Sequence, residues 1–356
     1  MKINQFFMLL CYCLALQACG GGSTSRASEP TVVTPDPFVF TNQGLKGLII
    51  ARLYEQQGKL LALTDNGLYQ QQQDTWQPLG LSGLSIRDLA FIDDKHWLAA
   101  VTKQDAEGLI SHQMHETLNS GATWQELKRS FGVDGEHEAI HALRYDATQK
   151  RLYATGTGVL ASSDNLGVSW QLLQGMWGSI GQAKSAFGFA PDRSRIWWGG
   201  QGAIENGVLY SYRLSDANQQ LFQNILPNPS TYYNVRFSGN RVLACGEGGI
   251  VVTENQGDNW KNLLPNSNFR FFFDVMIDTS RNNRLYTAGW DKKVSEPQPL
   301  ILQWSDDAGQ TWQSLQYKGA ADLYGGVRSM ILVKRQQQTH LYLGLYKGGI
   351  MQVVVQ

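Results

Sequence analysis

The side chains best suited to chemistry in this sequence are arginines that stand among apolar and aromatic residues. Arg87, Arg236 and Arg328 each lie in a short apolar run, and Tyr233 precedes Arg236 by three positions. A guanidinium group can bind a carboxylate through two parallel hydrogen bonds. Arginine together with aromatic residues is also the usual composition of a binding hot spot. These residues therefore favour recognition of an anionic group.

One cluster could bind a metal ion. Glu136, His137 and Glu138 are followed by His141, and two histidines can bind zinc with a further ligand. On a strand, His137 and His141 share one face while Glu138 points away. The sequence has no third metal ligand at a spacing that would complete such a site. The favoured interpretation is a solvated loop followed by one inward-facing histidine, and we predict neither a metal site nor a cofactor.

The usual motifs of catalysis are missing from the sequence. It has no Ser-His-Asp order, no Gly-rich phosphate loop and no CxxC pair. The Gly-rich stretches at 246–249 (GEGG) and 324–326 (YGG) are typical of turns between strands rather than of phosphate-binding loops. We therefore predict no catalytic residues.

Four short stretches share one pattern and set the spacing of the chain. They read TLNSGATW (117–124), SDNLGVSW (163–170), TENQGDNW (253–260) and SDDAGQTW (305–312), and we call them the four boxes. The hydroxyl and the Asp or Asn oxygen can accept backbone N–H groups in a tight turn. The Gly adopts positive φ at low cost, and the Trp buries a large ring between sheets. We assign an architectural role to Asn119, Trp124, Asn165, Trp170, Asn255, Trp260, Asp307 and Trp312.

Strand-like segments recur every 40 to 50 residues, which indicates a propeller or a solenoid. LYATG-type runs at 60–65, 97–102, 151–156, 196–200, 242–246, 284–289 and 341–345 predict the second strands of seven four-stranded units. The seventh unit ends after its third strand. A propeller closes its ring rather than expose a sheet edge. We therefore expect residues 37–41 to supply the missing fourth strand of an all-β, seven-bladed β-propeller over residues 37–356.

Aligning the segments that enter the innermost strands predicts one ring of side chains at the mouth of the central channel. The ring contains Arg87, His141, Ser185, Tyr233, Phe273 and Arg328, and a slip of one residue would reverse the inward face. Loops around such a mouth commonly carry binding residues. The residues that we predict to bind a partner are Arg87, His141, Lys184, Tyr233, Arg236 and Arg328.

The first 36 residues predict export and a membrane anchor. Residues 1–19 form a signal peptide with Lys2 before a short apolar run. Its end, Leu16 to Cys19, resembles a bacterial lipobox, so Cys19 is the expected lipidation site; an ordinary secretory signal is the alternative. Residues 20–36 are rich in Gly, Ser, Thr and Pro and read as a flexible tether. By the enterobacterial sorting rule, the residue that follows the lipidated cysteine decides the membrane. That residue is Gly20 and not Asp, so the expected location is the outer membrane.

The charge of the chain limits its partners. It carries 30 Lys and Arg against 30 Asp and Glu, whereas a nucleic-acid binder is usually basic. After cleavage only Cys19 and Cys245 would remain, so no internal disulfide is expected.

The boxes and the LYATG-type strands resemble the BNR/Asp-box propellers, and among these the photosystem II stability/assembly factor-like family. That resemblance implies a seven-bladed ring that acts in assembly or as a scaffold and binds a partner polypeptide through an Arg-rich face. Arg87, Arg236 and Arg328 could serve that role. We expect a non-enzymatic lipoprotein of the bacterial envelope that docks an envelope protein, or a glycan, at its channel mouth.

A glycoside hydrolase is the alternative, because sialidases and some glucanases also carry these boxes. A sialidase would need Arg87, Arg236 and Arg328 on the substrate carboxylate, with Tyr233, Glu136 and Asp88 beside them. A glucanase would need two facing carboxylates, for which Asp88 and Asp274 are the candidates. The early Arg-Ile-Pro motif of sialidases is missing, and those propellers have six blades.

Overall fold

The computed structural model describes residues 37–132, 137–179, 181–204, 206–223, 225, 229–264 and 270–356. These residues form strands β1 to β28 and no helix, so within them no helix is long and apolar enough to cross a membrane. The predicted signal peptide, Cys19, the tether and Glu136 lie outside the described residues.

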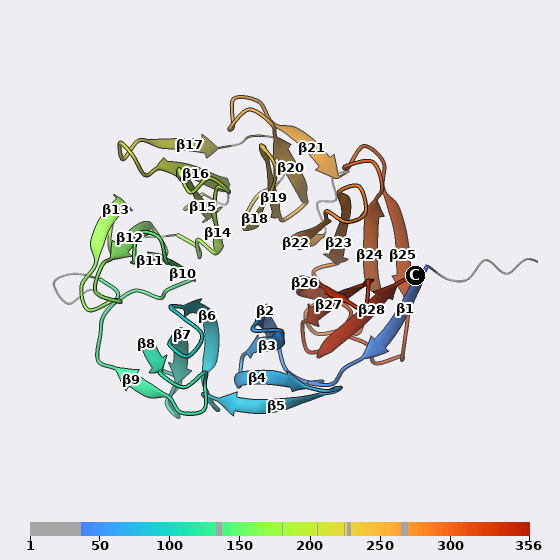
Figure 1. The fold of residues 1–356 in the computed structure, drawn as a ribbon, viewed down its shortest axis with the longest axis horizontal. Coiled ribbons are helices and arrows are strands. Elements are labelled where there is room, and N and C mark those ends of the chain that lie inside the picture. The colour runs from blue at the N-terminus through green and yellow to red at the C-terminus, as the bar shows by residue number, and fades with distance from the viewer. Residues whose placement is uncertain are drawn as a thin grey trace, which may run out of the picture. The chain divides into compact units, whose positions relative to one another are not determined.

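Seven four-stranded antiparallel sheets stand around a central channel as the blades of a propeller (Figure 1). The innermost strands are β2 (Ile50–Gln56), β6 (Ser85–Phe91), β10 (Ala142–Asp146), β14 (Ala186–Phe189), β18 (Tyr232–Ser238), β22 (Phe271–Asp278) and β26 (Val327–Arg335). The second strands are β3 (Lys59–Thr64), β7 (Trp97–Gln104), β11 (Arg151–Thr155), β15 (Arg195–Gln201), β19 (Arg241–Gly246), β23 (Arg284–Trp290) and β27 (Gln338–Leu345). The third strands are β4 (Gly67–Gln72), β8 (Ile110–Thr117), β12 (Val159–Ser163), β16 (Gly207–Arg213), β20 (Gly249–Thr253), β24 (Leu300–Ser305) and β28 (Ile350–Val355). The outermost strands are β5 (Thr75–Gly80), β9 (Gln125–Leu127), β13 (Gln171–Gly175), β17 (Gln219–Gln223), β21 (Lys261–Leu264), β25 (Gln313–Tyr317) and β1 (Phe38–Asn42).

The first strand of the chain closes the last blade. β1 pairs antiparallel with β28, with Phe38 opposite Val355 and Asn42 opposite Met351. The order of that sheet is β1-β28-β27-β26, so residues 38–42 form the outermost strand of blade seven. The predictions of seven blades, of antiparallel four-stranded sheets and of closure by the N-terminal strand are confirmed.

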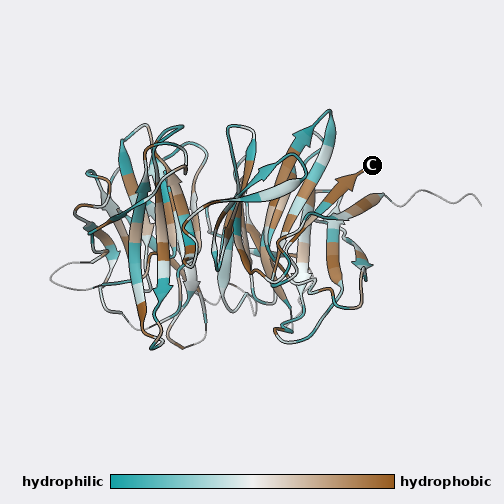
Figure 2. Ribbon diagram, turned by 90° about the horizontal axis from the view of Figure 1, so that it is seen from below, coloured by the Kyte–Doolittle hydropathy of each residue, from teal (hydrophilic) through white to brown (hydrophobic). Residues whose placement is uncertain are grey.

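The apolar core lies between the blades. One cluster combines Ala100 and Met114 of blade two with Leu152 and Ala161 of blade three, all nearly excluded from solvent. Figure 2 shows the same division, with apolar residues along the strands and hydrophilic residues at many of the loops. Because each sheet has two apolar faces, it is stable only when a neighbour covers each of them.

The four boxes form the turns between third and outermost strands. In the first box the Thr117 hydroxyl accepts the Gly121 N–H at 2.9 Å, and Asn119 Oδ1 accepts the Thr123 N–H at 2.8 Å. The other three boxes repeat both bonds. The residue before the glycine also adopts a left-handed conformation, with φ of 56° at Ser120. The sequence pattern did not indicate that feature.

The tryptophans of the four boxes pack against the preceding blade, and two of them also form hydrogen bonds to it. Trp124 of blade two donates its indole N–H to the Leu79 carbonyl of β5 at 3.1 Å. Trp312 of blade six donates to the Leu263 carbonyl of β21 at 2.7 Å. The boxes therefore fix the spacing of the blades at their outer edge.

Closure of the ring can be tested at Phe38. Its ring is 2% exposed and lies edge-on against Trp304 of blade six, with ring centroids 4.7 Å apart. We expect Phe38→Ala to lower the free energy of unfolding by about 3 to 5 kcal/mol, measured by urea denaturation. The neighbouring Val39 is 43% exposed, so Val39→Ala should change the free energy of unfolding by less than about 0.5 kcal/mol. Equal effects of the two variants would contradict the closure.

Candidate functional site

Two adjacent cavities occupy the central channel. The smaller, of 360 Å³, is lined by the first residues of the innermost strands, and we call it the strand-start cavity. The larger, of 820 Å³, is lined by later residues of the same strands, and we call it the strand-end cavity. Both are lined by Arg52, Asn234, Asp274 and Ser329, which therefore lie where the two cavities meet.

β-bulges turn the predicted ring of side chains toward the strand-start cavity. The pairing of inner and second strands shifts at Arg87, Tyr233, Phe273 and Arg328, each of which falls at the extra position of its inner strand. A bulge leaves its extra residue outside the regular ladder and re-aims the side chain. His141 and Ser185 directly precede β10 and β14, and these two innermost strands pair with their second strands without a bulge. The cavity lining includes Arg87, His141, Ser185, Tyr233, Phe273 and Arg328.

Two arginines of this cavity have no acidic partner. The Arg328 guanidinium lies 5.1 Å from the centre of the Phe273 ring, and its buried Nε has no hydrogen-bond partner. Arg87 Nε donates to Thr102 Oγ1 at 3.0 Å. Across the described residues, neither arginine takes part in an ion pair. Burial lowers the pKa of Arg87 and of Arg328, and the charge of Asp65, which lines the same cavity, offsets part of this effect at Arg328.

His141 adds a neutral ring to the same cavity. Burial lowers the pKa of His141 to about 3, with a further contribution from the charge of Arg87. The imidazole is therefore uncharged near neutral pH. Glu138 accepts the backbone N–H groups of Thr157 and Gly178, at 3.1 and 2.6 Å, and so holds the neighbouring loops. Among the described residues no group of three or more His, Cys, Asp or Glu could hold a metal ion.

A row of stacked aromatic rings extends from this cavity. Tyr233 stacks on Phe273 with centroids 4.1 Å apart, Phe273 on Trp290 at 5.8 Å, and Trp290 on Tyr346 at 4.9 Å. We call these four residues the aromatic row. Trp290 and Tyr346 were missed in the sequence, although the YGG stretch carried a signal. A Cβ at Gly326 would lie 2.4 Å from the Trp290 ring, so glycine permits the close approach.

Lys184 was predicted at the mouth, and its side chain instead lies between blades. It is 5% exposed, and its Nζ donates to the carbonyls of Thr157, Gln182 and Gln201 at 2.7, 2.9 and 2.7 Å. Burial lowers its pKa to about 8. Because side chains alternate along an extended strand, the inward direction of Ser185 turns Lys184 away from the channel.

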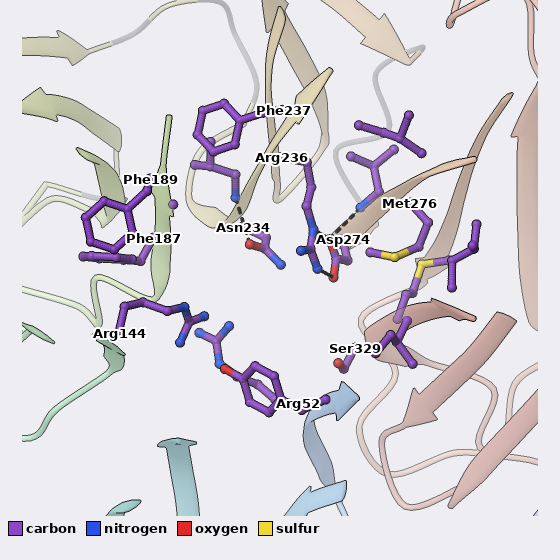
Figure 3. Close-up of a pocket in the computed structure, with 18 of the residues that line it drawn as sticks. Arg52, Arg144, Phe187, Phe189, Asn234, Arg236, Phe237, Asp274, Met276 and Ser329 are labelled. Atoms are coloured by element: carbon purple, nitrogen blue, oxygen red, sulfur yellow. Dashed lines mark hydrogen bonds and ion pairs between the residues drawn. The ribbon is translucent and has the colours of Figure 1, made fainter. Parts of the chain in front are cut away.

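Arg236 also lies away from the predicted mouth. It lines the strand-end cavity and forms two hydrogen bonds with Asp274, Nε to Oδ1 at 2.8 Å and Nη2 to Oδ2 at 2.7 Å (Figure 3). It follows Tyr233 by three residues, which corresponds to about 10 Å along a strand. Arg236 therefore lines the strand-end cavity and not the strand-start cavity where it was predicted.

These positions do not meet the requirements of the hydrolase alternative. Arg236 is separated from Arg87 and Arg328, so the three guanidinium groups do not converge on one carboxylate. Burial alone would raise the pKa of Asp88, but the charges of Arg144 and Arg52 hold it below its ordinary value. Asp274 is paired with Arg236. A general acid needs a raised pKa, which the ion-paired Asp88 does not have.

Comparison with solved structures agrees with this fold. The structure of YCF48 bound to D1 peptide matches with a TM-score of 0.59 and 15% identity, over 91% of this chain and 98% of that chain. The chain is a seven-bladed β-propeller with the fold of YCF48. An ancestral GH74 enzyme matches with a TM-score of 0.49 and 14% identity, over 84% of this chain and 53% of that one. The extracellular domain of a one-component system from B. thetaiotaomicron matches with a TM-score of 0.44 and 11% identity, over 88% of this chain and 53% of that chain.

The likenesses are limited to architecture. At 15% identity the match to YCF48 shows the fold alone, and the TM-scores of the other two structures are too low to support an argument. No family model matches the sequence, and no curated protein matches it. The binding roles predicted for Arg87, His141, Tyr233 and Arg328 therefore stay predictions.

The different roles of Lys184 and Arg87 can be separated by stability. Lys184→Met removes the donor from three buried carbonyls, and we expect it to lower the free energy of unfolding by about 2 to 4 kcal/mol. Arg87→Gln removes the charge of an exposed side chain and should change the free energy of unfolding by less than about 1 kcal/mol. Urea denaturation of both variants checks the difference. A small effect of Lys184→Met would return Lys184 to the set of candidate binding residues.

Proposed function

We propose that the protein is a non-enzymatic binding propeller that takes an acidic segment of a partner polypeptide into its strand-start cavity. The observation that carries this proposal is that exposed Arg87 and half-buried Arg328 both line the strand-start cavity and form no ion pair within the described residues. The buried Nε of Arg328 has no hydrogen-bond partner there. A buried charge without a partner is costly. A carboxylate from another chain would offset that cost and form charge-assisted hydrogen bonds.

The aromatic row supports a polypeptide as the source of the carboxylate. Tyr233, Phe273 and Tyr346 are half-buried, and the buried ring of Trp290 stacks between Phe273 and Tyr346. Such rings can bury apolar side chains that flank an acidic residue, as aromatic and arginine anchors do in protein interfaces. The formal charge of the whole chain is zero, so attraction of an acidic segment would be local to this mouth.

The likeness to YCF48 is consistent with this assignment, because that protein was solved bound to a D1 peptide. On the family resemblance of its boxes, we propose that this chain holds a polypeptide during assembly of a membrane complex. In the envelope, lipid on Cys19 and the tether over residues 20–36 would keep the ring beside its partner at the outer membrane.

The proposal excludes hydrolysis as the main activity. The two channel carboxylates offered for that chemistry, Asp88 and Asp274, are paired with Arg144 and Arg236. An ion-paired carboxylate is a poor general acid near neutral pH. Release of fluorophore from a fluorogenic sialoside or glucoside above background by the purified protein would contradict a non-enzymatic function.

The binding role can be tested by recovery of the partner. We expect the full-length lipoprotein to co-purify with an envelope polypeptide from detergent-solubilised membranes. The double variant Arg87→Glu, Arg328→Glu should lose it, because the cavity would then repel carboxylates. Lys59→Glu is the matched control, since Lys59 is exposed and begins the second strand of blade one, away from the strand-start cavity. Quantitative mass spectrometry of the eluates measures the recovery.

Equal recovery of that polypeptide by the wild-type protein and the double variant would remove the strand-start cavity from the proposal. Recovery of an acidic glycan in its place, lost in the double variant, would keep the cavity and replace the class of partner.

The anchor is tested at Cys19. Cys19→Ser removes the thiol that would carry the lipid, so we expect the protein to leave the membrane fraction and appear in the soluble fraction. Metabolic labelling with a radioactive fatty acid should label the wild-type protein and leave the variant unlabelled. A membrane-bound, unlabelled wild-type protein would contradict lipidation.

A further inference from the structure

The strand-end cavity at the other end of the channel has no part in the proposed function. It has a volume of 820 Å³ and is lined by the middle and last residues of six innermost strands. The usual size of pockets for small ligands is about 300 to 1,000 Å³. Figure 3 shows Arg52 and Arg144 reaching toward its middle from one side, and Arg236 and Asp274 from the other.

Two of the three inner arginines of this cavity are neutralised by neighbouring blades. Arg144 Nη1 lies 2.5 Å from Asp88 Oδ2, and Arg236 holds Asp274 through two hydrogen bonds. The charge of Asp88 acts on Arg144 strongly enough to raise the pKa of that guanidinium in spite of its burial. These two pairs use the buried carboxylates of Asp88 and Asp274.

Arg52 shares the carboxylate of Asp88 with Arg144 and has no second acidic partner among the described residues. Asp88 already accepts from the Tyr54 hydroxyl, from Arg144 and from the backbone N–H groups of Leu89 and Leu143. Four donors fill the acceptor capacity of one carboxylate. Arg52 Nε stays 3.5 Å from Asp88 Oδ1, beyond a good hydrogen bond.

The remaining donors of Arg52 are available to a ligand. Its Nη2 donates to the Ser185 carbonyl at 3.0 Å, and its side chain is 16% exposed. A guanidinium carries five N–H donors in a rigid fork. Because Arg52 lines the cavity, part of that fork can receive an anion that enters from the strand-end side.

Part of the wall of this cavity is apolar. Phe189, Phe237 and Ile277 are half-buried and line the cavity. An inorganic anion would leave these side chains unused. A ligand with an anionic head and an apolar body would bury them and meet Arg52 at the same time.

We propose that the strand-end cavity binds an amphiphilic carboxylate, a small molecule with one carboxyl group on an aliphatic or aromatic body. The carboxylate sits on Arg52, and the body packs against Phe237 and Ile277. Glu55, which is exposed and lines the same cavity, opposes the ligand weakly by charge. Arg52 lies where this site meets the strand-start cavity, but binding of the small ligand does not depend on the proposed partner.

Titration calorimetry with octanoate as the probe tests the proposal on the full-length protein. We expect saturable binding of one octanoate to the wild-type protein, and octanamide, which lacks the charge, should bind much more weakly. Arg52→Gln should weaken octanoate binding by about tenfold or more, as expected for the loss of a charged hydrogen bond. Arg87→Gln, in the strand-start cavity, should leave it unchanged.

Glu55→Gln gives a second readout that does not depend on how Arg52→Gln folds. Removal of an exposed negative charge beside the site should tighten octanoate binding by about twofold. Absence of saturable octanoate binding to the wild-type protein would overturn the proposal. So would equal binding of octanamide, or a loss in Arg87→Gln as large as that in Arg52→Gln. None of these outcomes affects the recovery of a protein partner, so the two proposals fail independently.

Discussion

Closure of the ring by β1 on β28 is the constraint on which the rest of the structure depends. Each blade is a sheet with two apolar faces, and it can bury both only between two other blades. The seventh sheet receives its outermost strand from the beginning of the chain, with Phe38 opposite Val355. The Phe38 ring also reaches Trp304 in blade six. Closure therefore completes a hydrogen-bonded edge and an interface between blades with the same short strand.

The closed ring places equivalent residues of the innermost strands at equal depth in the channel. All seven of these strands run in the same direction from the previous blade, so side chains from distant parts of the sequence meet by position along the strand. At one depth the carboxylates are matched by arginines of adjacent blades, Asp88 by Arg144 and Asp274 by Arg236. Near the strand starts, the guanidinium groups of Arg87 and Arg328 have no such match. The same repeat thus produces two chemically different levels.

The seven blades and the strand-start ring were predictable because each depends on a repeated pattern. The spacing of boxes and LYATG-type strands fixed the number of blades. Alignment of the innermost strands then brought together Arg87, His141, Tyr233 and Arg328, because the bulges recur at one position of several blades. A shared register needs no knowledge of tertiary contacts, so the sequence was sufficient for it.

The errors arose where a single contact outside the repeat decided the outcome. Lys184 was placed at the mouth, but strand alternation turned it onto three carbonyls between blades. Arg236 was placed there too, yet its partner Asp274 comes from the next blade and lies deeper. Arg52 was overlooked because its importance depends on Asp88 being filled by other donors. Each of these facts depends on which side chains meet across blades, and the linear pattern carries no record of that.

The difference between paired and unpaired arginines decides where an anion can bind in this channel. A carboxylate that approaches Arg144 or Arg236 meets a guanidinium whose charge Asp88 or Asp274 already compensates, and it is repelled by that carboxylate. A carboxylate that approaches Arg328 meets a buried guanidinium with an unpartnered Nε. The gain from a charge-assisted hydrogen bond is largest where no competing acceptor is present. The layer of paired charges therefore separates the two cavities by charge.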